Sequence, residues 1–459
     1  MMQDGRLAVV VLAAGAGKRF RSPTPKVLHE AAGLPLVHHV LRAVQGLDRI
    51  DRVLVVVGKE AEMVGESVKS LVPAAELIEQ TELLGTGDAV QRCAEALEDF
   101  DGTVLVLSGD SPLITTPTLK RLIDAHRQSG SPVTLLTARV GDPSGYGRII
   151  RDGEERCTGI VEQSDATEQQ ASIDEVSSGI WCFERGPLFD ALERTDNANA
   201  QGEFYLPQAA MLIAEGHGSI PTVLAGDAEE IEGVNDRLQL AFAGRVLRKR
   251  KIEALAAEGV GIEDPQTTYI DAGVEVGPDT LIRPFTFIEG TSRIGSGCSI
   301  GPSARIVDSV VEDGAEITFA VVKESSIGPS ASVGPFASLR PGTRLGPGSK
   351  AGSFVEIKGS TIGEGSKVPH LSYVGDAEIG SGVNLGAGTI TANYDSESKL
   401  KSKTVIGDAA FTGSDTTLVA PVKLGRRAGT GAGSVVTRDV SDGQIVAGVP
   451  ARPMRERKP

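Results

Sequence analysis

"YIDAGVEVGPDTLIRPFTFIEGTSRIGSGCSIGPSARI", residues 269–306, decides the fold of the C-terminal half of this chain. Neither the face of a helix, which recurs at about 3.6 residues, nor that of a strand, which recurs at about 2, explains its pattern. Gly or Pro in almost every hexad also excludes a long helix. A branched aliphatic residue instead stands at every sixth position, namely Ile270, Val276, Ile282, Ile288, Ile294, Ile300 and Ile306.

The residue four places after each aliphatic is also of limited volume. These positions hold Val274, Thr280, Thr286, Ser292, Cys298 and Ala304. One branched and one restricted residue per unit fit an interior with little room, while Gly, Pro, Asp, Ser and Arg elsewhere suit turns and solvent. The pattern is typical of a hexapeptide-repeat parallel β-helix, and a flexible Gly-rich loop does not explain an unbroken period.

The hexad pattern extends from about residue 262 to 450, with interruptions. The frame slips around 307–326. It resumes at Ile327, Val333, Leu339 and Leu345, then at Ile362, Val368 and Val374, and again at Leu418, Leu424 and Thr430. The largest interruption is NYDSESKLKSK, residues 393–403. In a solenoid such a segment is a loop that leaves one turn, commonly on the binding face.

The N-terminal half has a different organisation. Residues 7–140 alternate helical stretches with the apolar runs LAVVVLAAG, RVLVVVG, AELIEQ, TVLVLSGD and PVTLLTAR, which predicts a mostly parallel sheet covered on both faces. Residues 141–234 are more mixed and predict extra strands and a long hairpin. Residues 235–259 predict one long helix, with Asn235 as its N-cap and Gly259 as its stop. We therefore expect a first domain at 1–234, a linker helix at 235–261 and a hexapeptide domain at 262–459.

Composition narrows the functional classes. The chain has 459 residues and a formal net charge of −15, which argues against nucleic acid or an anionic membrane surface as a partner. Its four cysteines are widely spaced, form no CxxC and lack His companions, so they predict neither a disulfide framework nor a zinc site. No apolar run is long enough for a membrane helix, and the N-terminus does not read as a signal peptide. A cytoplasmic location is the expectation.

A Gly-rich turn, LAAGAGKRFRSPTPK at residues 12–26, follows the first buried-type strand. Backbone N–H groups approach a phosphate closely where side chains are absent. The turn lacks the Walker A spacing, and Phe20 stands where a dinucleotide fingerprint has its third glycine. Arg19 and Lys26 nevertheless strengthen the prediction of a phosphate site.

Other polar residues follow other strands of the predicted sheet. Gln80 and the turn at 85–87 come after one strand, and Asp110 comes after another. Ligands of open α/β sheets bind outside the carboxyl ends of the strands, so these groups should converge on one crevice. Asp110 is either a simple turn residue or a magnesium ligand, because Mg²⁺ typically uses one or two carboxylates together with phosphate oxygens.

These motifs carry a resemblance. LAAGAGKRF…PK, GTGDA, GDSPL, GYGRI, VEQSDA and NAQGEFYLP together resemble the sugar-1-phosphate nucleotidylyltransferases. With the hexapeptide half attached, essentially the whole chain resembles the bifunctional N-acetylglucosamine-1-phosphate uridylyltransferase / glucosamine-1-phosphate acetyltransferase family. The resemblance implies an α/β nucleotidyltransferase domain, a Rossmann-like mixed sheet, followed by a left-handed parallel β-helix. It also implies a homotrimer with acetyltransferase sites between neighbouring subunits.

The resemblance also implies roles for residues of the N-terminal half. Arg19 and Lys26 would oppose the charge that shifts during attack, and Asp110 and Asn235 would carry Mg²⁺. The UTP or UDP-sugar contacts would be Leu12, Ala13, Ala14, Gly15, Lys26, Gln80, Gly85, Thr86, Gly147, Glu162, Ser177 and Asn235. Ser177 stands where the family usually has Asn, and Ser108 where it usually has an aromatic residue.

In the hexapeptide half, His370 and Tyr373 fall two and five places after Val368 in the hexad frame, so neither needs to point inward. His is a natural base near neutral pH, and nearby cations suit a phosphate. The alternative is a half that serves only as an oligomerisation stalk.

By resemblance, His370 takes the proton of the attacking amine. Arg340 and Lys358 bind the phosphate of glucosamine 1-phosphate, with Tyr373, Asn384 and Asn393 at the sugar. Acetyl-CoA would contact Ala387, Asn393, Tyr394, Ser414 and Ala432, and Lys399 would reach the adjacent subunit's site. Gly448 stands where some members of the family have Arg.

The hypothesis is therefore a two-activity enzyme that makes UDP-N-acetylglucosamine, a precursor of cell-wall peptidoglycan, from glucosamine 1-phosphate, acetyl-CoA and UTP. One alternative is another sugar-1-phosphate nucleotidylyltransferase with a hexapeptide tail for assembly or regulation. A second is a scaffolding protein with inactive sites. His370 and the NYDSESK segment favour the first reading, because a tail that only assembles or regulates needs neither.

Overall fold

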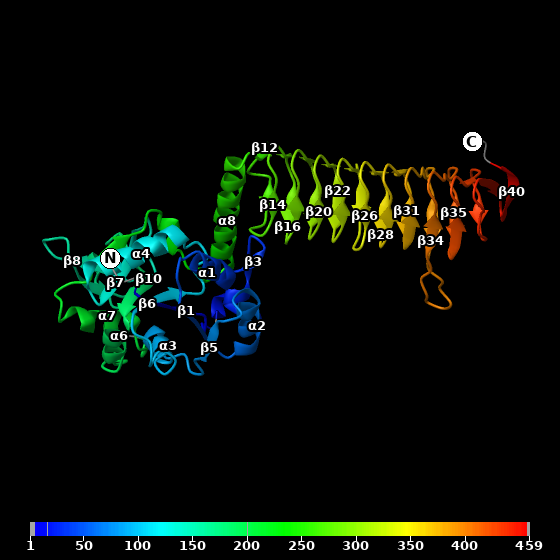
Figure 1. Cartoon of the computed structure of the whole chain (residues 1–459). Coiled ribbons are helices and arrows are strands. Elements are labelled where there is room, and N and C mark those ends of the chain that lie inside the picture. The colour runs from blue at the N-terminus through cyan, green and yellow to red at the C-terminus, as the bar shows by residue number, and fades with distance from the viewer. Residues whose placement is uncertain (1–4, 16, 200, 457–459) are drawn as a thin grey trace. The chain divides into compact units, whose positions relative to one another are not determined.

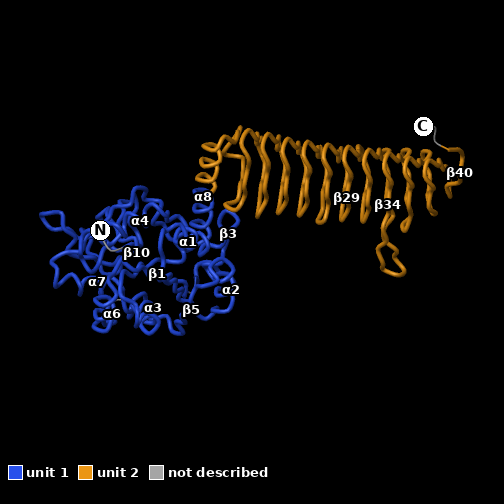
Figure 2. Tube along the Cα trace, viewed as in Figure 1, with its two compact units in different colours: residues 1–247 blue, residues 248–459 orange. Residues whose placement is uncertain are grey.

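The computed structural model describes residues 5–15, 17–199 and 201–456, and it forms two compact units, residues 1–247 and 248–459 (Figure 2). The division falls inside the long helix α8 (Arg237–Ala257). The domain boundaries expected at 234 and 261 stay a prediction. Among the described helices, none combines the length and the apolar character that a membrane crossing requires.

The first unit is built on a mixed sheet with the strand order β11-β7-β10-β6-β1-β4-β5 (Figure 1). Neighbouring strands along this path run parallel, except that β10 is antiparallel to both β6 and β7. The strands are β1 (Leu7–Leu12), β4 (Arg52–Val57), β5 (Glu76–Glu79), β6 (Thr103–Ser108), β7 (Val133–Arg139), β10 (Glu175–Glu184) and β11 (Thr222–Leu224). The predicted mostly parallel sheet is confirmed.

Helices cover both faces of this sheet because its central strands are continuous apolar runs, which present apolar side chains on both sides. In β1, Val9 and Val11 join one core cluster, while Ala8 and Val10 join another, and all four are fully buried. The first cluster includes α1 (Leu36–Gln45), α2 (Ala61–Leu71) and α4 (Thr116–Ser129). The second includes α3 (Thr86–Gln91), α6 (Arg185–Leu192) and α7 (Leu206–Ala214).

The mixed segment expected at 141–234 forms an antiparallel hairpin of β8 (Arg148–Arg151) and β9 (Cys157–Val161), which is attached to β10. Its remaining elements are α5 (Glu168–Ala171) and η3 (Ala228–Ile231). Earlier in the chain lie η1 (Lys18–Phe20), η2 (Lys26–Leu28) and the small pair β2 (Glu30–Ala31) and β3 (Leu34–Pro35).

Helix α8 begins later than predicted, and the assignment of Asn235 as its N-cap is wrong. The carboxylate of Asp236 accepts the backbone N–H groups of Leu238 and Gln239, each at 2.9 Å, and so satisfies the open donors of the first turn. The side chain of Asn235 is engaged elsewhere, as described below. The predicted stop is confirmed, since Gly259, two residues past the helix, has φ +92°.

The second unit is a three-sided parallel β-helix, as predicted from the hexads. Successive short strands go in turn to three sheets, and every pairing within these three sheets is parallel up to residue 436. Here the first, second and third β-helix sheets are named in the order in which the chain enters them. The coil geometry agrees with the expected left-handed β-helix.

The first β-helix sheet contains β12 (Gly261–Ile262), β15 (Leu281–Ile282), β18 (Ser299–Ile300), β21 (Glu316–Ile317), β24 (Ser332–Val333), β27 (Lys350–Ser353) and β30 (Lys367–His370). The second contains β13 (Tyr269–Ile270), β16 (Phe287–Glu289), β19 (Arg305–Val307), β22 (Ala320–Lys323), β25 (Ala337–Leu339), β28 (Glu356–Lys358), β31 (Tyr373–Gly375), β33 (Ile390–Ala392), β35 (Thr417–Val419) and β38 (Val435–Val436). The third contains β14 (Glu275–Val276), β17 (Arg293–Ile294), β20 (Val310–Val311), β23 (Ser326–Ile327), β26 (Arg344–Leu345), β29 (Thr361–Ile362), β32 (Ala377–Ile379), β34 (Thr404–Ile406) and β36 (Val422–Leu424). β37 (Gly429–Thr430), β39 (Gln444–Gly448) and β40 (Ala451–Glu456) close the C-terminal end.

The two restricted positions of each hexad form the core of the coil. All seven aliphatic residues of the opening stretch and all six limited-volume residues are at most 8% exposed. The hexad frame slips around 307–326 because one coil contains fewer residues there. Ile282 pairs with Ile300, 18 residues later, whereas Ile306 pairs with Val322, 16 residues later. The segment 393–403 leaves the coil between β33 and β34 as the predicted loop (Figure 1).

Candidate functional sites

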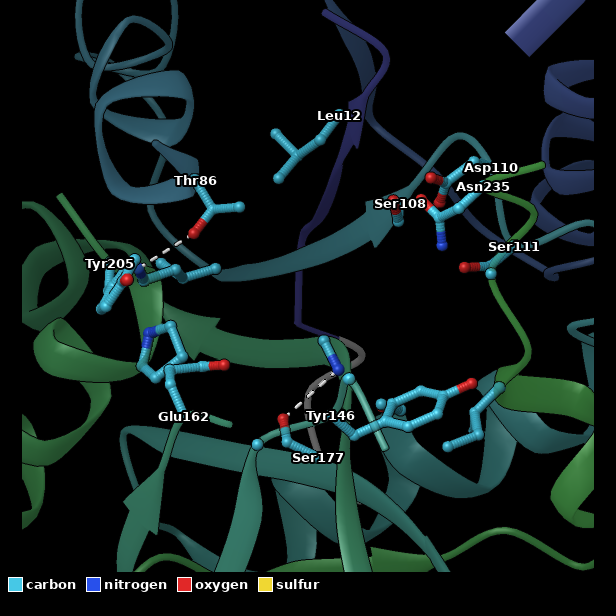
Figure 3. Close-up of a pocket in the computed structure, with 18 of the residues that line it drawn as sticks. Leu12, Thr86, Ser108, Asp110, Ser111, Tyr146, Glu162, Ser177, Tyr205 and Asn235 are labelled. Carbon is cyan, nitrogen blue, oxygen red and sulfur yellow. Dashed lines mark hydrogen bonds between the residues drawn. The ribbon is translucent and has the colours of Figure 1, made fainter. Parts of the chain in front are cut away.

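A crevice of the first unit lies at the carboxyl ends of β1 and β6. It consists of two cavities of about 470 and 270 Å³ that share Leu12, Thr86, Ser108, Asp110 and Glu203. In Figure 3, Asp110 and Asn235 lie at one end of the larger cavity, Thr86 and Tyr205 at another, and Glu162 and Ser177 on a further wall. The crevice is where parallel-sheet topology predicts a ligand.

The Gly-rich turn brings bare backbone against a lysine. Gly17 has φ +56°, and a Cβ atom there would come 2.7 Å from the Cβ of Lys26. Glycine is therefore required both by the backbone conformation and by the close approach. Residues Ala13, Ala14, Gly15 and Lys26 line the smaller cavity.

Two oxygen ligands converge on the Lys26 ammonium. Lys26 Nζ donates to Asn235 Oδ1 at 3.1 Å and pairs with the carboxylate of Asp110. The side chains of Lys26 and Asp110 are only 12% and 15% exposed. A carboxylate and an amide oxygen that share one cation form a donor set that also fits Mg²⁺, the remaining ligands being phosphate oxygens and water.

The fold itself places Asp110 beside Asn235. The N–H of Val234 donates to the carbonyl of Asp110 at 2.8 Å, so the chain entering α8 is bonded to the chain leaving β6. Ser108 Oγ donates to Asp110 Oδ1 at 2.6 Å and orients the carboxylate. The family's aromatic residue is thus replaced here by a hydroxyl that acts on Asp110. Among the described residues, no group of three or more His, Cys, Asp and Glu side chains forms a metal site.

The turn at 85–87 is held by a distant segment. Gly85 has φ +109°, and a Cβ atom there would come 2.5 Å from the carbonyl oxygen of Phe204. Both amide hydrogens of the buried Gln80 are used locally, since its Nε2 donates to Gly85 O at 3.1 Å and to Asp88 Oδ2 at 2.8 Å. Gln80 Oε1 therefore remains as the acceptor at the cavity wall, and an imide N–H, which uracil has and cytosine lacks, is a matching donor.

Glu162 lies next to Gly147 on the wall of the larger cavity that also carries Ser177. A Cβ atom on Gly147 would come 3.3 Å from Glu162 Oε1, so the glycine leaves the carboxylate accessible. Burial, and then the nearby Asp165, raise the pKa of Glu162, while Arg148 opposes the shift. Tyr146 lines the same cavity, and burial raises its pKa to about 12, so it presents a neutral hydroxyl.

The buried Arg148 holds in place the segments that carry Gly147 and Glu162. It is 1% exposed, and its guanidinium donates to the carbonyl of Tyr146, to Gln163 Oε1 at 2.7 Å and to the carbonyl of Ala171 at 3.3 Å. Gln163 Oε1 also accepts the N–H of Gly145 at 3.1 Å. One buried cation thus fixes the segment 145–147, the loop after β9 and the end of α5.

Every residue that the sequence predicted for a nucleotide or sugar site in this unit lines the crevice. Ser177, at the family's Asn position, closes a β-bulge instead, since its Oγ accepts the N–H of Gly179 at 3.3 Å. Sequence reasoning missed Tyr146, Glu203 and Tyr205, which also line the crevice. They lie within GYGRI and NAQGEFYLP, two motifs that carried the resemblance, so the signal was present.

In the second unit, four predicted residues stack along one edge of the coil. The carbonyl of His370 accepts the N–H of Gly388, the carbonyl of Ala387 accepts that of Asp415, and the carbonyl of Ser414 accepts that of Gly433. His370, Ala387, Ser414 and Ala432 therefore occupy successive coils in one column. His370, Ser414 and Ala432 are exposed, which leaves the column open to a long extended ligand.

The predicted phosphate ligands lie on the second β-helix sheet. The N–H of Arg340 donates to the carbonyl of Ile357, so Arg340 and Lys358 are neighbours on adjacent strands, and Lys358 pairs in turn with Gly375. Arg340 also makes a 2.8 Å ion pair with Glu356. A Cβ atom on Gly375 would come 2.5 Å from Tyr373 Oη and 2.8 Å from Asn393 Nδ2, so both side chains lie over this glycine.

The remaining predictions fall around this sheet. Asn384 is exposed on the coil after His370, and Tyr394 is exposed at the start of the loop. Lys399 lies in the loop with φ +57°. Gly448 has φ +99°, a conformation that an Arg at this position would adopt only under strain.

Comparisons with known proteins agree with both units. Residues 9–195 match the family described as MobA-like NTP transferase domain. A "Bifunctional protein GlmU" from Thermobifida fusca is 50% identical over 453 residues, which cover 98% of this chain and 92% of that protein. Proteins of the same description from Syntrophomonas wolfei and Mycolicibacterium gilvum are each 47% identical, over 95% and 98% of this chain and 96% and 90% of those proteins. A solved UDP-glucose pyrophosphorylase complexed with UDP-glucose gives a TM-score of 0.44 at 16% identity, over 53% of this chain and 99% of that chain, which is too distant to carry an argument.

Proposed function

The chain belongs to the family of bifunctional GlmU proteins, and from this premise we propose how its residues carry the two reactions. The protein is a bifunctional transferase of UDP-N-acetylglucosamine synthesis. It acetylates glucosamine 1-phosphate with acetyl-CoA, and then transfers uridylyl from UTP to N-acetylglucosamine 1-phosphate with release of pyrophosphate. The relatives match over both units, which favours this reading over a nucleotidylyltransferase whose hexapeptide half only assembles or regulates.

We assign uridylyl transfer to the crevice of the first unit. UTP lies along Leu12, Ala13, Ala14 and Gly15, with its uracil at Gln80, Gly85 and Thr86. The acetylated sugar lies at Gly147, Glu162 and Ser177. The observation that carries this assignment is the convergence of these residues on one crevice, in which Asp110 lines both cavities, Lys26 the smaller and Asn235 the larger.

The reaction requires no protein nucleophile. A phosphate oxygen of the sugar attacks the α-phosphorus of UTP, a P–O bond forms, and the bond to the bridging oxygen breaks so that pyrophosphate leaves with the electron pair. Lys26 and Arg19 oppose the charge that moves onto the leaving group. Mg²⁺, held by Asp110 and Asn235, would screen and polarise the phosphate oxygens. Catalysis then rests on positioning and on cations.

We assign acetyl transfer to the second unit. The amine of glucosamine 1-phosphate attacks the thioester carbon, a C–N bond forms and the C–S bond breaks. His370 takes the proton from nitrogen and returns it to the departing thiolate, so the two halves of the step balance. Arg340 and Lys358 bind the sugar phosphate, with Tyr373, Asn384 and Asn393 at the sugar. Ala387, Tyr394, Ser414 and Ala432 hold CoA.

We propose that the protein is a homotrimer whose acetyltransferase sites lie between subunits. The second β-helix sheet and the edge beside it carry an exposed apolar stripe, which comprises Tyr269, Phe285, Phe287, Phe319, Val321, Phe336, Phe354, Leu371 and Ile390. The rings of Phe319, Phe336 and Phe354 follow one another along this stripe, with centroids 5.6 Å apart in the first pair, which is tilted, and 5.2 Å apart in the second, which is stacked. A stripe of this kind marks a protein interface, and it adjoins His370 through Leu371.

The experiment is a single reconstitution. Purified protein is incubated with glucosamine 1-phosphate, acetyl-CoA, UTP and Mg²⁺, and the products are resolved by mass. UDP-N-acetylglucosamine, CoA and pyrophosphate are expected. The assignment is contradicted if no free CoA is formed, or if the UDP-sugar lacks the acetyl group. Light scattering should give three times the chain mass of 47.8 kDa. We place the enzyme in the cytoplasm, where UTP and acetyl-CoA are available.

A further inference from the structure

The loop at 393–403 does not leave the coil as one free segment. Its base is closed by hydrogen bonds from the N–H of Ser402 to the carbonyl of Asn393 at 2.9 Å and from the N–H of Asp395 to the carbonyl of Leu400 at 3.0 Å. Tyr394 and Lys401 form an antiparallel bridge between them. The loop is therefore a short hairpin, with Lys401 in its returning arm and close to the sheet that the loop left.

Lys401 lies against a second lysine of the same chain. Asn393, whose carbonyl accepts the N–H of Ser402, lies over Gly375, and Gly375 is the strand partner of Lys358. The returning arm therefore brings the Lys401 ammonium close to that of Lys358, and Arg340 adds a third positive charge nearby. Like charges this close repel, so the neighbouring Lys401, and then Arg340, lower the pKa of Lys358, while Asp376 opposes the shift. Nothing in the packing of the coil requires this contact, because all three side chains lie outside the core.

The carboxylates around this cluster do not resolve the repulsion. Glu356 is paired with Arg340 at 2.8 Å, and Asp376 accepts a hydrogen bond from the amide of Asn393. Among the described residues, three cations at this place face these two carboxylates, and although Asp376 attracts Lys358, a net positive charge remains. A phosphate dianion placed between the two lysines would turn the repulsion into two charge-assisted hydrogen bonds.

The other lysines of the loop have different surroundings. Lys403 Nζ makes a 2.6 Å ion pair with Glu378 on the third β-helix sheet, so its charge is already balanced. Lys399 lies beyond the closing bonds of the hairpin, in the exposed part of the loop. Among the three loop lysines, Lys401 is the one that meets the predicted phosphate ligands of its own chain.

We propose that Lys401 is a third cationic ligand for the phosphate of glucosamine 1-phosphate, and that it acts within its own subunit together with Arg340 and Lys358. This assignment rests on the acetyltransferase site proposed above and extends it. The loop then has two parts with separate tasks. Its base completes the phosphate site in cis, while its tip is available to an adjacent subunit.

Direct binding tests the assignment without the complication of turnover. In a His370→Ala background, which removes the base, glucosamine 1-phosphate binding is measured by calorimetry with no acetyl-CoA present. Adding Lys401→Ala should weaken binding on the order of tenfold, the value of one hydrogen bond between charged groups. Adding Lys401→Arg should retain most of the affinity. Lys403→Ala is the matched control, because it removes a lysine of the same loop that is already paired.

The outcomes separate this inference from the proposed function. Arg340→Ala and Lys358→Ala test the proposed phosphate site itself. If neither variant changes the KM for glucosamine 1-phosphate, and the His370→Ala protein does not bind this ligand, the proposed site is wrong. If binding is normal and Lys401→Ala behaves like Lys403→Ala, the role of Lys401 is overturned. The circular dichroism spectrum and the mass of each variant in solution, compared with those of the wild-type protein, report that the β-helix has folded.

A mixing experiment tests the action in cis. Differently tagged Lys401→Ala and His370→Ala chains are co-expressed, and mixed assemblies are isolated through both tags. If Lys401 acts in its own subunit, no site contains both intact residues, and acetylation stays at the sum of the two single variants. Recovery of activity in the mixed assemblies would assign Lys401 to a neighbouring subunit and refute the cis placement.

Discussion

Lys26 Nζ donates to Asn235 Oδ1 at 3.1 Å, across 209 residues of sequence, and the same ammonium pairs with Asp110. A cation is therefore already present between the two oxygens that we assign to Mg²⁺. Lysine and metal cannot share this position. With Mg²⁺ and UTP bound, the Lys26 ammonium would leave Asp110 and pair with the phosphates, where its charge is needed.

This competition predicts that Lys26→Met increases the affinity of the nucleotide-free protein for a divalent cation, by roughly tenfold, because a neutral side chain no longer occupies the site. The measurement is titration with Mn²⁺ followed by electron paramagnetic resonance, since the free and bound ions differ in signal. Lys18→Met, which changes an exposed lysine of the same segment, should leave Mn²⁺ affinity unchanged. Equal or weaker binding in Lys26→Met would show that the ammonium does not compete.

Asp110→Ala should abolish uridylyl transfer and leave acetyl transfer near its normal rate. The loss should reach at least about 10³-fold, since the cation between the carboxylate and the phosphates is worth several kcal/mol. The two activities separate because Asp110 and His370 belong to different compact units. Chelation of Mg²⁺ in the wild-type protein should reproduce the pattern. A folded variant that loses both activities to the same extent contradicts the separation.

His370→Ala should have the opposite effect. Acetyl transfer should fall by roughly 10² to 10⁴, the usual contribution of a general base. Formation of UDP-N-acetylglucosamine from supplied N-acetylglucosamine 1-phosphate should continue. The rate of CoA release is the direct measurement. If the His370→Ala variant kept the wild-type rate between about pH 6 and 8, His370 would have no role as a base.

Particular residues explain how far the sequence predicts this protein. The hexads predict the core of the coil because only branched and small residues fit its interior, and every such position in the opening stretch is buried. Asn235 was misassigned because Asp236 is an equally good cap and no local signal separates them. Glu203 and Tyr205 lie in NAQGEFYLP, a motif that carries the resemblance, but the contact of this segment with the turn at 85–87, which brings them to the crevice, is seen only in the structure.

The same limit applies to Lys401. Its segment has no period, so the sequence identifies a loop rich in lysine and predicts nothing about which lysine turns back to the coil. The hairpin bonds at its base decide that. The frame slip also depends on structure, because coils of 16 and 18 residues keep the same core and differ only in their turns.

Arg148 should act as a positioning residue for the sugar. Arg148→Met should raise the KM for N-acetylglucosamine 1-phosphate by about tenfold and that for UTP much less, because the guanidinium fixes the segments that carry Gly147 and Glu162. Arg148 also lowers the pKa of Glu162, which burial raises, so its removal should raise that pKa further. The acid limb of kcat/KM should then move to higher pH.

Arg148→Lys is the matched variant, since it keeps the charge but does not span three acceptors. It should raise KM while leaving the acid limb near its wild-type position. If both variants change KM without moving the limb in Arg148→Met, the residue acts by structure alone and its charge has no part.

Lys399 belongs to the exposed part of the loop, beyond the bonds that close the hairpin. These bonds pair the backbone at the base of the hairpin and leave the tip exposed, so the charge of Lys399 is available to a neighbouring surface. We expect Lys399 to act in the acetyltransferase site of the adjacent subunit, and only the trimer to acetylate. Each of Lys399→Ala and His370→Ala should be nearly inactive alone.

Mixed trimers decide whether Lys399 acts in trans. When the two chains are combined, a site that takes His370 from one subunit and Lys399 from its neighbour contains both intact residues, and acetylation should partly return. If Lys399 acts within its own chain, no mixed trimer contains such a site, and CoA release stays at the background of the two variants. The expected result is opposite to that for Lys401→Ala in the same pairing, although the two lysines are separated only by Leu400. Identical behaviour of the two mixtures would contradict the division of the loop into a base that serves its own subunit and a tip that serves the next.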